Sequence, residues 1–449
     1  MIKAKIISQI MGSGKSSGIV NMLNYDPAYK DRKVIYIAPF LSEAKRFARS
    51  CDREFVEPKA WSEFDNSKLT HTRMLLSENK SISTTHAAFM RYDDEILRLV
   101  REGDYILIMD ETCNVMEDFS WNPADVWVLQ QAGIIFSRWD RFIFNDDYEH
   151  YLDSGGALAD LCRKMKHMDL RCYTEEDTGR YFYYTMPPEI LKSFSDVFVL
   201  TYMWECSDLC TMMNMIGMEW EYRYIEQVDY GNGYMITDEK PEIPEYVKKI
   251  PELIHIYEHE PSQTKRGKQP RDLNSWVDKR GRIQKKRPFK LSVWFFQNKK
   301  KNHAVITELK NNIRTYFRKI LAEHGGSRDE CMWSTYKDYM DELYSEKNSW
   351  LESRFVSFNE RAKNEYAGCK YLAYAVDIFP NPIKERWYER NGFTYQSDMV
   401  ALSTMCQWIW RSAIRKGEDI YIYVPAERMR NLLKDWLRAI GNGEMWCEI

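Results

Sequence analysis

Four residues near the start of the chain have the types and the spacing of a phosphate-binding loop. Gly12, Gly14, Lys15 and Ser16 follow a strand-like run at residues 3–7. The glycines let backbone N–H groups close around phosphate oxygens, and the helix that follows adds the positive end of its dipole. Lys15 would reach the β- and γ-phosphates, and the Ser16 hydroxyl would hold Mg²⁺. One position departs from the usual loop, since Gln9 stands where its first glycine is expected. We expect ATP with Mg²⁺ to be bound by Gly12, Ser13, Gly14, Lys15, Ser16 and Ser17.

A pair of acids further along the chain completes the chemistry that such a loop needs. Asp110 and Glu111 end an apolar run at residues 104–110. Runs of this kind are typical of parallel strands covered on both faces, whose carboxyl ends are where α/β sheets bind ligands. We expect Asp110 to complete the Mg²⁺ shell and Glu111 to orient and deprotonate the attacking water. A solvated acidic turn is the alternative interpretation, and the phosphate-binding loop upstream makes it the less favoured one.

Composition narrows the class of protein. The 449 residues are 44% hydrophobic and 29% charged, which predicts a globular protein of two or three domains. The net charge of −3 means that a polyanion would have to meet a local basic surface. The ten cysteines include no C-x-x-C pair, which argues against a zinc ribbon and fits a reducing cytoplasm. No signal peptide and no membrane span are predicted, so a cytoplasmic location is expected.

The elements that must position these residues follow an alternating pattern. Over the first 205 or so residues we expect further strands at 33–38, 80–85, 141–144 and 197–201, and helices at 42–51 and 87–101. A second pattern predicts strands at 291–296, 355–358, 371–378 and 419–424, and helices at 303–322, 399–415 and 427–439. Strands alternating with helices indicate parallel sheets, so the predicted fold class is α/β with two lobes.

A strongly basic segment separates the two patterns. Between residues 260 and 301 many lysines and arginines, among them Lys265, Arg266, Lys300 and Lys301, face few acids. Prolines and glycines interrupt this segment, which predicts a loop or linker. A solvated linker and an electrostatic grip on a nucleic-acid backbone are about equally favoured interpretations.

Taken in order, these segments resemble superfamily 2 helicases, particularly those of phages, mobile elements and replication origins. The resemblance rests on the loop at Gly12–Ser16, on Asp110 and Glu111, and on residues 35–41 and 83–86, which look like backbone-contacting motifs. In the segment that corresponds to the family's motif for coupling hydrolysis to motion, Thr201 is the one residue that matches. The resemblance implies a P-loop NTPase with a RecA-like ATP-binding lobe at 1–225, a basic linker at 226–289 and a second RecA-like lobe at 290–449.

The resemblance also nominates residues in the second lobe. Gln407, Arg411 and Arg415 look like the family's motif VI, although Arg415 falls one residue later than usual. Their spacing of four predicts one helical face. In the family, this motif faces the nucleotide and stabilises charge on the γ-phosphate. Pairing of the arginines with surface acids is the alternative. Residues 357–365 resemble motif V, where Asn359, Arg361 and Asn364 either contact ribose or phosphate or simply form a turn.

The sequence therefore predicts an ATP-dependent nucleic-acid translocase or helicase that hydrolyses ATP between its lobes. Single-stranded DNA is the favoured partner, RNA the alternative, and replication proteins are further candidates. Three other functions stay open. A packaging-type motor would need a nuclease centre, for which only Asp377 lies at a predicted strand end. A scaffold or loader would use ATP as a switch, and an ATPase acting on proteins is disfavoured by the basic segment.

Overall fold

The computed structural model describes residues 3–64, 66–175, 179–258, 260–262, 271–277, 280–285, 290–344, 346–359 and 364–448. The chain forms two compact units. The first comprises Met1–Pro241, Pro382–Tyr395 and Glu448–Ile449, and the second comprises Glu242–Asn381 and Gln396–Cys447. These bounds differ from the expected lobes at 1–225 and 290–449. The range predicted to be a linker, 226–289, is divided between the two units after Pro241, because its described elements pack with one unit or the other.

A parallel sheet of seven strands forms the centre of the first unit. Its order is β12 (Trp220–Tyr222), β1 (Ala4–Ser8), β11 (Asp196–Thr201), β5 (Ile106–Asp110), β2 (Val34–Ala38), β4 (Ser81–Thr85) and β3 (Phe55–Val56). The central strands are almost wholly buried because helices cover both faces, and this explains their continuous apolar sequences. The strands expected around 3–7, 33–38, 80–85, 104–110 and 197–201 are confirmed.

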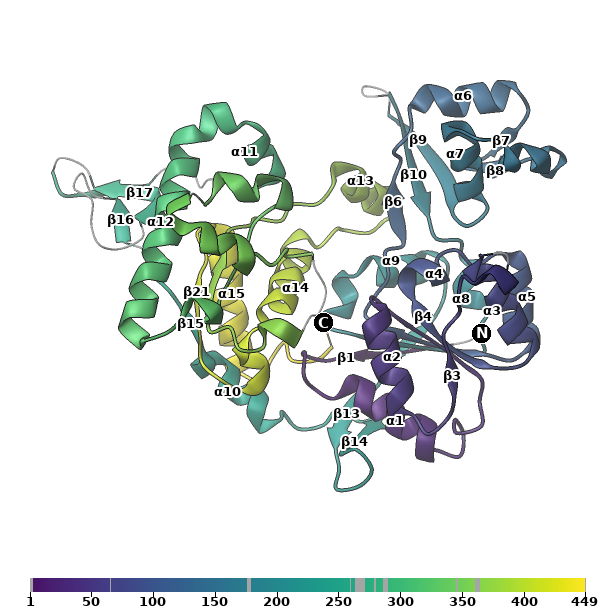
Figure 1. Cartoon of the computed structure of the whole chain (residues 1–449), viewed down its shortest axis with the longest axis horizontal. Coiled ribbons are helices and arrows are strands. Elements are labelled where there is room, and N and C mark those ends of the chain that lie inside the picture. Colours follow the sequence, from purple (N-terminus) through teal and green to yellow (C-terminus); the bar gives the residue numbers. More distant parts are fainter. Residues whose placement is uncertain are drawn as a thin grey trace. The chain divides into compact units, whose positions relative to one another are not determined.

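Helices alternate with the sheet strands of this unit. α1 (Lys15–Tyr25) and α2 (Leu41–Ser50) follow β1 and β2, and α3 (Lys68–Ser77) precedes β4 (Figure 1). The single helix expected at 87–101 is two helices, α4 (His86–Phe89) and α5 (Asp94–Glu102). The break has a local cause, because the Asp93 side chain accepts a hydrogen bond from Ile96 N and caps α5.

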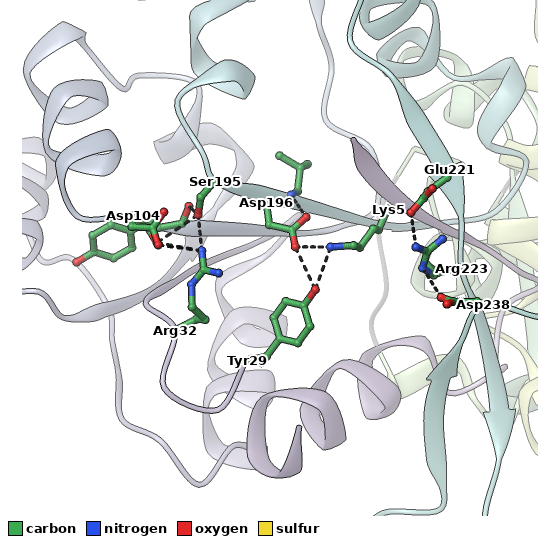
Figure 2. Close-up of polar contacts among 11 residues, drawn as sticks. Lys5, Tyr29, Arg32, Asp104, Ser195, Asp196, Glu221, Arg223 and Asp238 are labelled. Atoms are coloured by element: carbon green, nitrogen blue, oxygen red, sulfur yellow. Dashed lines mark hydrogen bonds and ion pairs between the residues drawn. The ribbon is translucent and has the colours of Figure 1, made fainter. Parts of the chain in front are cut away.

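A polar network fastens the amino ends of the sheet strands. Lys5 Nζ on β1 donates to Tyr29 Oη at 2.9 Å and forms an ion pair with Asp196 at the start of β11 (Figure 2). Tyr29 also donates to Asp196, at 3.1 Å. Beside this group, Arg32 donates to Ser195 Oγ at 2.6 Å. The network joins the chain that leaves α1 to two sheet strands and so helps to fix β1 next to β11.

An antiparallel sheet is inserted between β5 and β11. Its order is β6 (Met116–Asp118), β10 (Gly179–Thr185), β9 (Asp169–Glu175), β8 (Arg141–Phe144) and β7 (Ile135–Arg138), accompanied by α6 (Pro123–Gln131) and α7 (Ala157–Met165) (Figure 1). The strand expected at 141–144 is therefore present, but in this second sheet. A late segment of the chain, α13 (Pro382–Arg390), packs here too, since Arg390 donates to Thr174 O at 2.8 Å.

The second unit contains a parallel sheet of four strands. The order is β15 (Ile254–Ile256), β21 (Ile420–Tyr423), β20 (Tyr371–Tyr374) and β19 (Cys331–Ser334). Its helices include α10 (Glu245–Leu253), α12 (Lys299–His324), α14 (Ser397–Ile409) and α15 (Glu427–Gly441) (Figure 1). The strand expected at 419–424 and the helices expected at 303–322 and 427–439 are confirmed. The protein is thus an α/β protein with parallel sheets.

Several predictions for the second unit are wrong. Residues 291–296 do not form a strand, because Ser292 caps the short helix α11 (Val293–Gln297) through a hydrogen bond from Phe295 N. At 355–358 only Phe355 bridges to Trp333. The basic segment contains β16 (Glu260–Ser262), β17 (Arg271–Val277) and β18 (Ile283–Lys285) rather than only a loop. Its residues 263–270, 278–279 and 286–289 lie outside the described ranges.

No helix in the described ranges combines the length and the apolar run that crossing a bilayer requires.

Candidate nucleotide-binding site

The predicted phosphate-binding loop lies between β1 and α1. Gly12 and Gly14 have φ values of 85° and 82°, which glycine adopts without the steric cost that other residues bear. Gly14 is the N-cap of α1 and makes no side-chain cap hydrogen bond. A ligand at the loop can therefore accept hydrogen bonds from the first backbone N–H groups of the helix. Ser13 is only 6% exposed, and its Oγ has no hydrogen-bond partner within the described residues. A buried hydroxyl without a partner is costly, and a ligand oxygen at this loop would satisfy it.

Lys15 opens α1 and turns back onto its own loop. Its Nζ donates to Gln9 O at 2.6 Å and to Ile10 O at 3.2 Å. Burial lowers the pKa of Lys15 below its ordinary value, although the Glu111 and Asp110 carboxylates act in the opposite direction. The loop and the paired acids, which come from different strands, therefore share one electrostatic environment.

The two acids lie at the carboxyl end of β5. Tyr36 Oη donates to Asp110 Oδ2 at 2.6 Å. His86 Nε2 lies 3.0 Å from Asp110 O, and since a carbonyl oxygen only accepts, this nitrogen carries the proton. Burial raises the pKa of Asp110, while the Tyr36 hydrogen bond and the Lys15 charge oppose that rise. β1, β11 and β5 are parallel neighbours, so the loop and the acids lie at the same edge of the sheet.

Glu111 has a strained backbone. Its φ of 61° is in the left-handed region, which is uncommon for residues other than glycine. The Glu111 N–H donates to Leu200 O at 2.8 Å and so continues the pairing of β5 with β11 past the end of β5. Such strain persists only where the surrounding structure enforces it, and it concentrates at functional sites. Here the left-handed backbone ends the extended conformation of β5 at Glu111.

The structure adds a third acid that the sequence did not nominate. Glu43 lies in the first turn of α2, and its Oε2 is buried without a hydrogen-bond partner among the described residues. Burial is the largest cause that raises the pKa of Glu43 to about 7, and the Asp110 carboxylate adds to it, while Arg46 opposes. The sequence does contain a signal for Glu43, because this residue follows β2 closely and so lies at the same sheet edge as Asp110.

The acids do not form a metal cage by themselves. Within the described ranges no group of three or more His, Cys, Asp or Glu side chains is arranged to hold a metal ion. Mg²⁺ commonly uses one or two carboxylates together with substrate phosphates. Ser16 and Asp110 are therefore suited to hold Mg²⁺ only jointly with a bound nucleotide.

The raised pKa of Glu43 predicts a pH dependence of stability. Because the folded-state pKa is about 7 and the ordinary value is 4.5, the contribution of the protonated group is lost as pH rises through 7. The melting temperature of Glu43→Gln, taken relative to that of the native chain, should therefore be higher at pH 8 than at pH 5. Thermal denaturation at both pH values measures this difference. The exposed Glu78→Gln is the matched control, and a constant difference for Glu43→Gln across this range would contradict the expectation.

Gln9, the departure from the usual loop, is explained by a hairpin. β13 (Tyr224–Gln227) and β14 (Tyr234–Thr237) form an antiparallel pair. Gln9 is 0% exposed, and its side chain accepts from Ile225 N at 2.6 Å and donates to Ile225 O at 3.3 Å. The Tyr234 ring packs against Gly14 so closely that any Cβ at Gly14 would overlap it. A glycine at position 9 would lose both hydrogen bonds, so glutamine fastens the loop to the hairpin.

The residues expected to form motif VI do not share a helical face. α14 ends at Ile409, with Trp410 as its C-cap, so only Gln407 lies on the helix. Ser412 Oγ donates to Ile409 O at 2.6 Å, and Ala413 N bonds to Cys369 O at 2.9 Å instead of continuing the helix. The single face predicted for Gln407, Arg411 and Arg415 is therefore wrong.

The two arginines differ in their surroundings. Arg411 is 6% exposed and donates to Ser357 O at 2.9 Å, which joins the segments resembling motifs VI and V inside the second unit. Arg415 is exposed in a short 3₁₀ turn, Ala413–Lys416. Arg361 lies outside the described residues. Asp377, the candidate for a nuclease centre, is buried and pairs with Arg428 at 2.8 Å, which satisfies its charge without a metal.

Comparison with known proteins shows a relative that matches along almost the whole of this chain. Residues 248–437 match the family described as the YonV C-terminal Rossmann-like domain. The whole chain is similar to the SPbeta prophage-derived protein YonV of Bacillus subtilis strain 168, with 32% identity over 444 residues that cover 97% of this chain and 99% of that protein.

Two solved structures are also similar, at low scores. The DUF1998 helicase MrfA, crystallised with DNA and AMPPNP, has a TM-score of 0.32 and 9% identity over 97% of this chain. The chain spans about half of MrfA, 48% of its length. Dbp5 of S. cerevisiae, bound to RNA and ADP BeF3, has a TM-score of 0.30 and 11% identity, covering 98% of this chain and 83% of Dbp5.

Proposed function

The chain belongs to the family of the prophage-derived protein YonV, and from the site in its first unit we propose that it is an ATP-dependent nucleic-acid translocase or helicase. The observation that carries the proposal is that the glycine loop with Lys15, between β1 and α1, lies at the same edge of a parallel sheet as Asp110 and Glu111 at the end of β5. A cation from a glycine loop and two acids from another strand at one sheet edge form the set of groups that phosphoryl transfer uses.

The residues of the first unit have distinct roles in this proposal. ATP with Mg²⁺ would supply the phosphoanhydride whose cleavage drives the cycle. Lys15 would leave the carbonyl oxygens of its own loop and bind the terminal phosphates, and Ser13 Oγ would gain the partner it lacks. Asp110 and Ser16 would hold the metal, and Glu111 would take the proton of the attacking water.

A nucleic-acid partner is supported by a basic and aromatic surface on the second unit. Lys299, Lys300 and Lys301 occupy the first turn of α12, which contains no acid. Cations at this end of a helix interact unfavourably with its dipole. Lys299 pairs with Glu342, whereas Lys300 and Lys301 are exposed and form no ion pair with the described residues. Trp294, immediately upstream on α11, is 65% exposed. The phosphates of a nucleic acid would compensate the charges of these lysines, and a base would stack on the Trp294 indole.

The steady-state rate of ATP hydrolysis tests the proposal. It should be measured with no polymer, single-stranded DNA, duplex DNA or RNA, each at low and high salt. Strong stimulation by one polymer that high salt removes is expected and would identify the track. Turnover that no polymer stimulates would contradict the nucleic-acid part of the proposal. We favour DNA, and the replication of a mobile element is the process to which such an activity would belong.

The basic surface makes a separate prediction about salt. The double variant Lys300→Ala, Lys301→Ala should weaken binding to single-stranded DNA and reduce the slope of log K against log salt by about 1–2. Fluorescence anisotropy of a labelled oligonucleotide across a salt series measures both quantities. Lys310→Ala on the same helix serves as the control. An unchanged slope would mean that these lysines do not contact phosphates.

A nucleotide-gated nucleic-acid-binding module is the second candidate, and one observation favours it. Arg411 is already engaged inside the second unit, by its hydrogen bond to Ser357 O. If this role is structural, ATP would change the affinity for nucleic acid without strand displacement.

Arg411→Ala separates the two candidates. In a motor it should keep ATP binding and lose about 10²-fold or more of hydrolysis, as removal of one transition-state contact does. Arg411→Lys keeps the charge and controls for it, and the melting temperature of both variants reports the structural role. Normal hydrolysis with a lowered melting temperature would assign Arg411 to packing alone.

A further inference from the structure

A cavity of about 360 Å³ begins at the last two residues of the phosphate-binding loop. Ser16 and Ser17 line one end of it, Arg46 and Phe47 of α2 line a second side, and Gly231 and Asn232 in the turn of the β13–β14 hairpin close a third. Its walls are thus contributed by segments far apart in the sequence. The cavity is large enough for a nucleoside, and it is continuous with the residues proposed to hold phosphates.

We propose that this cavity binds the ribose and the base of the nucleotide, and that Asn232 selects adenine. The inference rests on the proposed ATP site and extends it to a hairpin that carries no nucleotide-binding motif. It assigns to the hairpin a specificity role in addition to the fastening of the loop through Gln9.

The turn of the hairpin is held in place by α1. Asn21 is buried, and its side chain donates to Tyr234 O at 2.5 Å and accepts from Asn232 N at 3.2 Å. Gly231 has a φ of 60°, and a Cβ there would lie 2.6 Å from Asn21 Oδ1. Only glycine permits this close approach. The position of Asn232 is therefore set by contacts to α1 and not by the turn alone.

The chemistry of the Asn232 side chain follows from the hydrogen bond that it makes to the phosphate-binding loop. Asn232 Nδ2 donates to Ser17 O at 2.7 Å. A carbonyl oxygen can only accept, so this contact fixes the amide orientation and leaves Oδ1 as an acceptor. The exocyclic amino group of adenine donates to such an acceptor, whereas the O6 of guanine would oppose it with a second acceptor. Val20 and Phe47 supply apolar surface for the base.

The test compares three ligands on the full-length chain by isothermal titration calorimetry: ATP, GTP and inorganic tripolyphosphate, each with Mg²⁺. The native chain should bind ATP at least about 10-fold more tightly than GTP, the discrimination expected from one base contact. Asn232→Ala should lower ATP affinity by about 10-fold and remove the preference, and it should leave tripolyphosphate affinity unchanged. Gly231→Ala, which displaces the turn, should act in the same direction. Asp229→Ala, in the same turn but outside the cavity, should behave as the native chain.

The tripolyphosphate measurement separates the two levels of the proposal. If tripolyphosphate binds the native chain and Lys15→Ala removes it, the phosphate site stands. An unchanged ATP-to-GTP ratio in Asn232→Ala, with circular dichroism as in the native chain, would then overturn the role of Asn232 alone. If neither tripolyphosphate nor ATP binds the native chain, the proposed function itself fails.

Discussion

Replacing Lys15 by alanine should reduce ATP hydrolysis by at least about 10³-fold, to the level of a blank reaction. The Lys15 ammonium group donates to Gln9 O of the loop and is electrostatically coupled to Glu111 and Asp110. Preorganised charge of this kind supplies the largest single part of catalysis in most phosphoryl-transfer sites. Steady-state release of phosphate, with and without single-stranded DNA, measures the loss.

Two controls keep this result interpretable. Lys15→Ala removes a partly buried cation together with two hydrogen bonds to loop carbonyls, so its melting temperature must be compared with that of the native chain. Lys33→Ala, at a partly exposed lysine before β2, controls for loss of a charge on the same unit. Full hydrolysis by Lys15→Ala would reject the assignment of the loop, and with it the ATP-driven function.

The parts of the site that the sequence predicted are those whose signal is local. β1 and β5 are almost wholly buried; the β5 run ends at Asp110, and the β1 run is followed by the loop that begins at Gly12. A glycine loop before a helix and an acid pair after a strand are read from consecutive residues, so their place at one sheet edge followed from the parallel topology.

The parts that the sequence missed depend on residues far apart in the chain. Gln9 looks like a defect in the loop until Ile225 is seen to satisfy both ends of its amide. Glu43 is an ordinary helix residue until Asp110, 67 positions later in the sequence, is placed beside it. Hydrophobic periodicity likewise reveals neither the inserted antiparallel sheet nor the packing of α13 with the first unit.

The wrong prediction of one helical face for Gln407, Arg411 and Arg415 also arises from contacts between residues far apart in the chain. Spacing of four predicts a helical face only while the helix continues, and α14 ends at Ile409. Ser412 bonds to Ile409 O, and Ala413 bonds to Cys369 O outside the helix, so tertiary partners override a favourable helical pattern. Similarly, the apolar run at 291–296 has the composition of a strand, but the cap at Ser292 makes it a helix.

Glu111→Gln should uncouple binding from hydrolysis. Glutamine keeps the size of the side chain at a backbone with a φ of 61°, but it cannot take a proton from water at neutral pH. Hydrolysis should fall by about 10²–10⁴-fold, the usual contribution of a general base, while the affinity for ATP stays within a few-fold. Single-turnover hydrolysis and calorimetry with ATP measure the two quantities separately.

The same variant tests whether hydrolysis drives release of nucleic acid. In a translocase, blocking the chemical step traps the ATP-bound state, so Glu111→Gln should remain on single-stranded DNA in the presence of ATP where the native chain dissociates. Asp104→Asn is the matched control, since Asp104 is also an acid in the left-handed region, with a φ of 56°, but lies at the opposite end of β5. Hydrolysis at the native rate in Glu111→Gln would remove the base role from this residue and make Glu43, the other acid beside Asp110, the group to examine next.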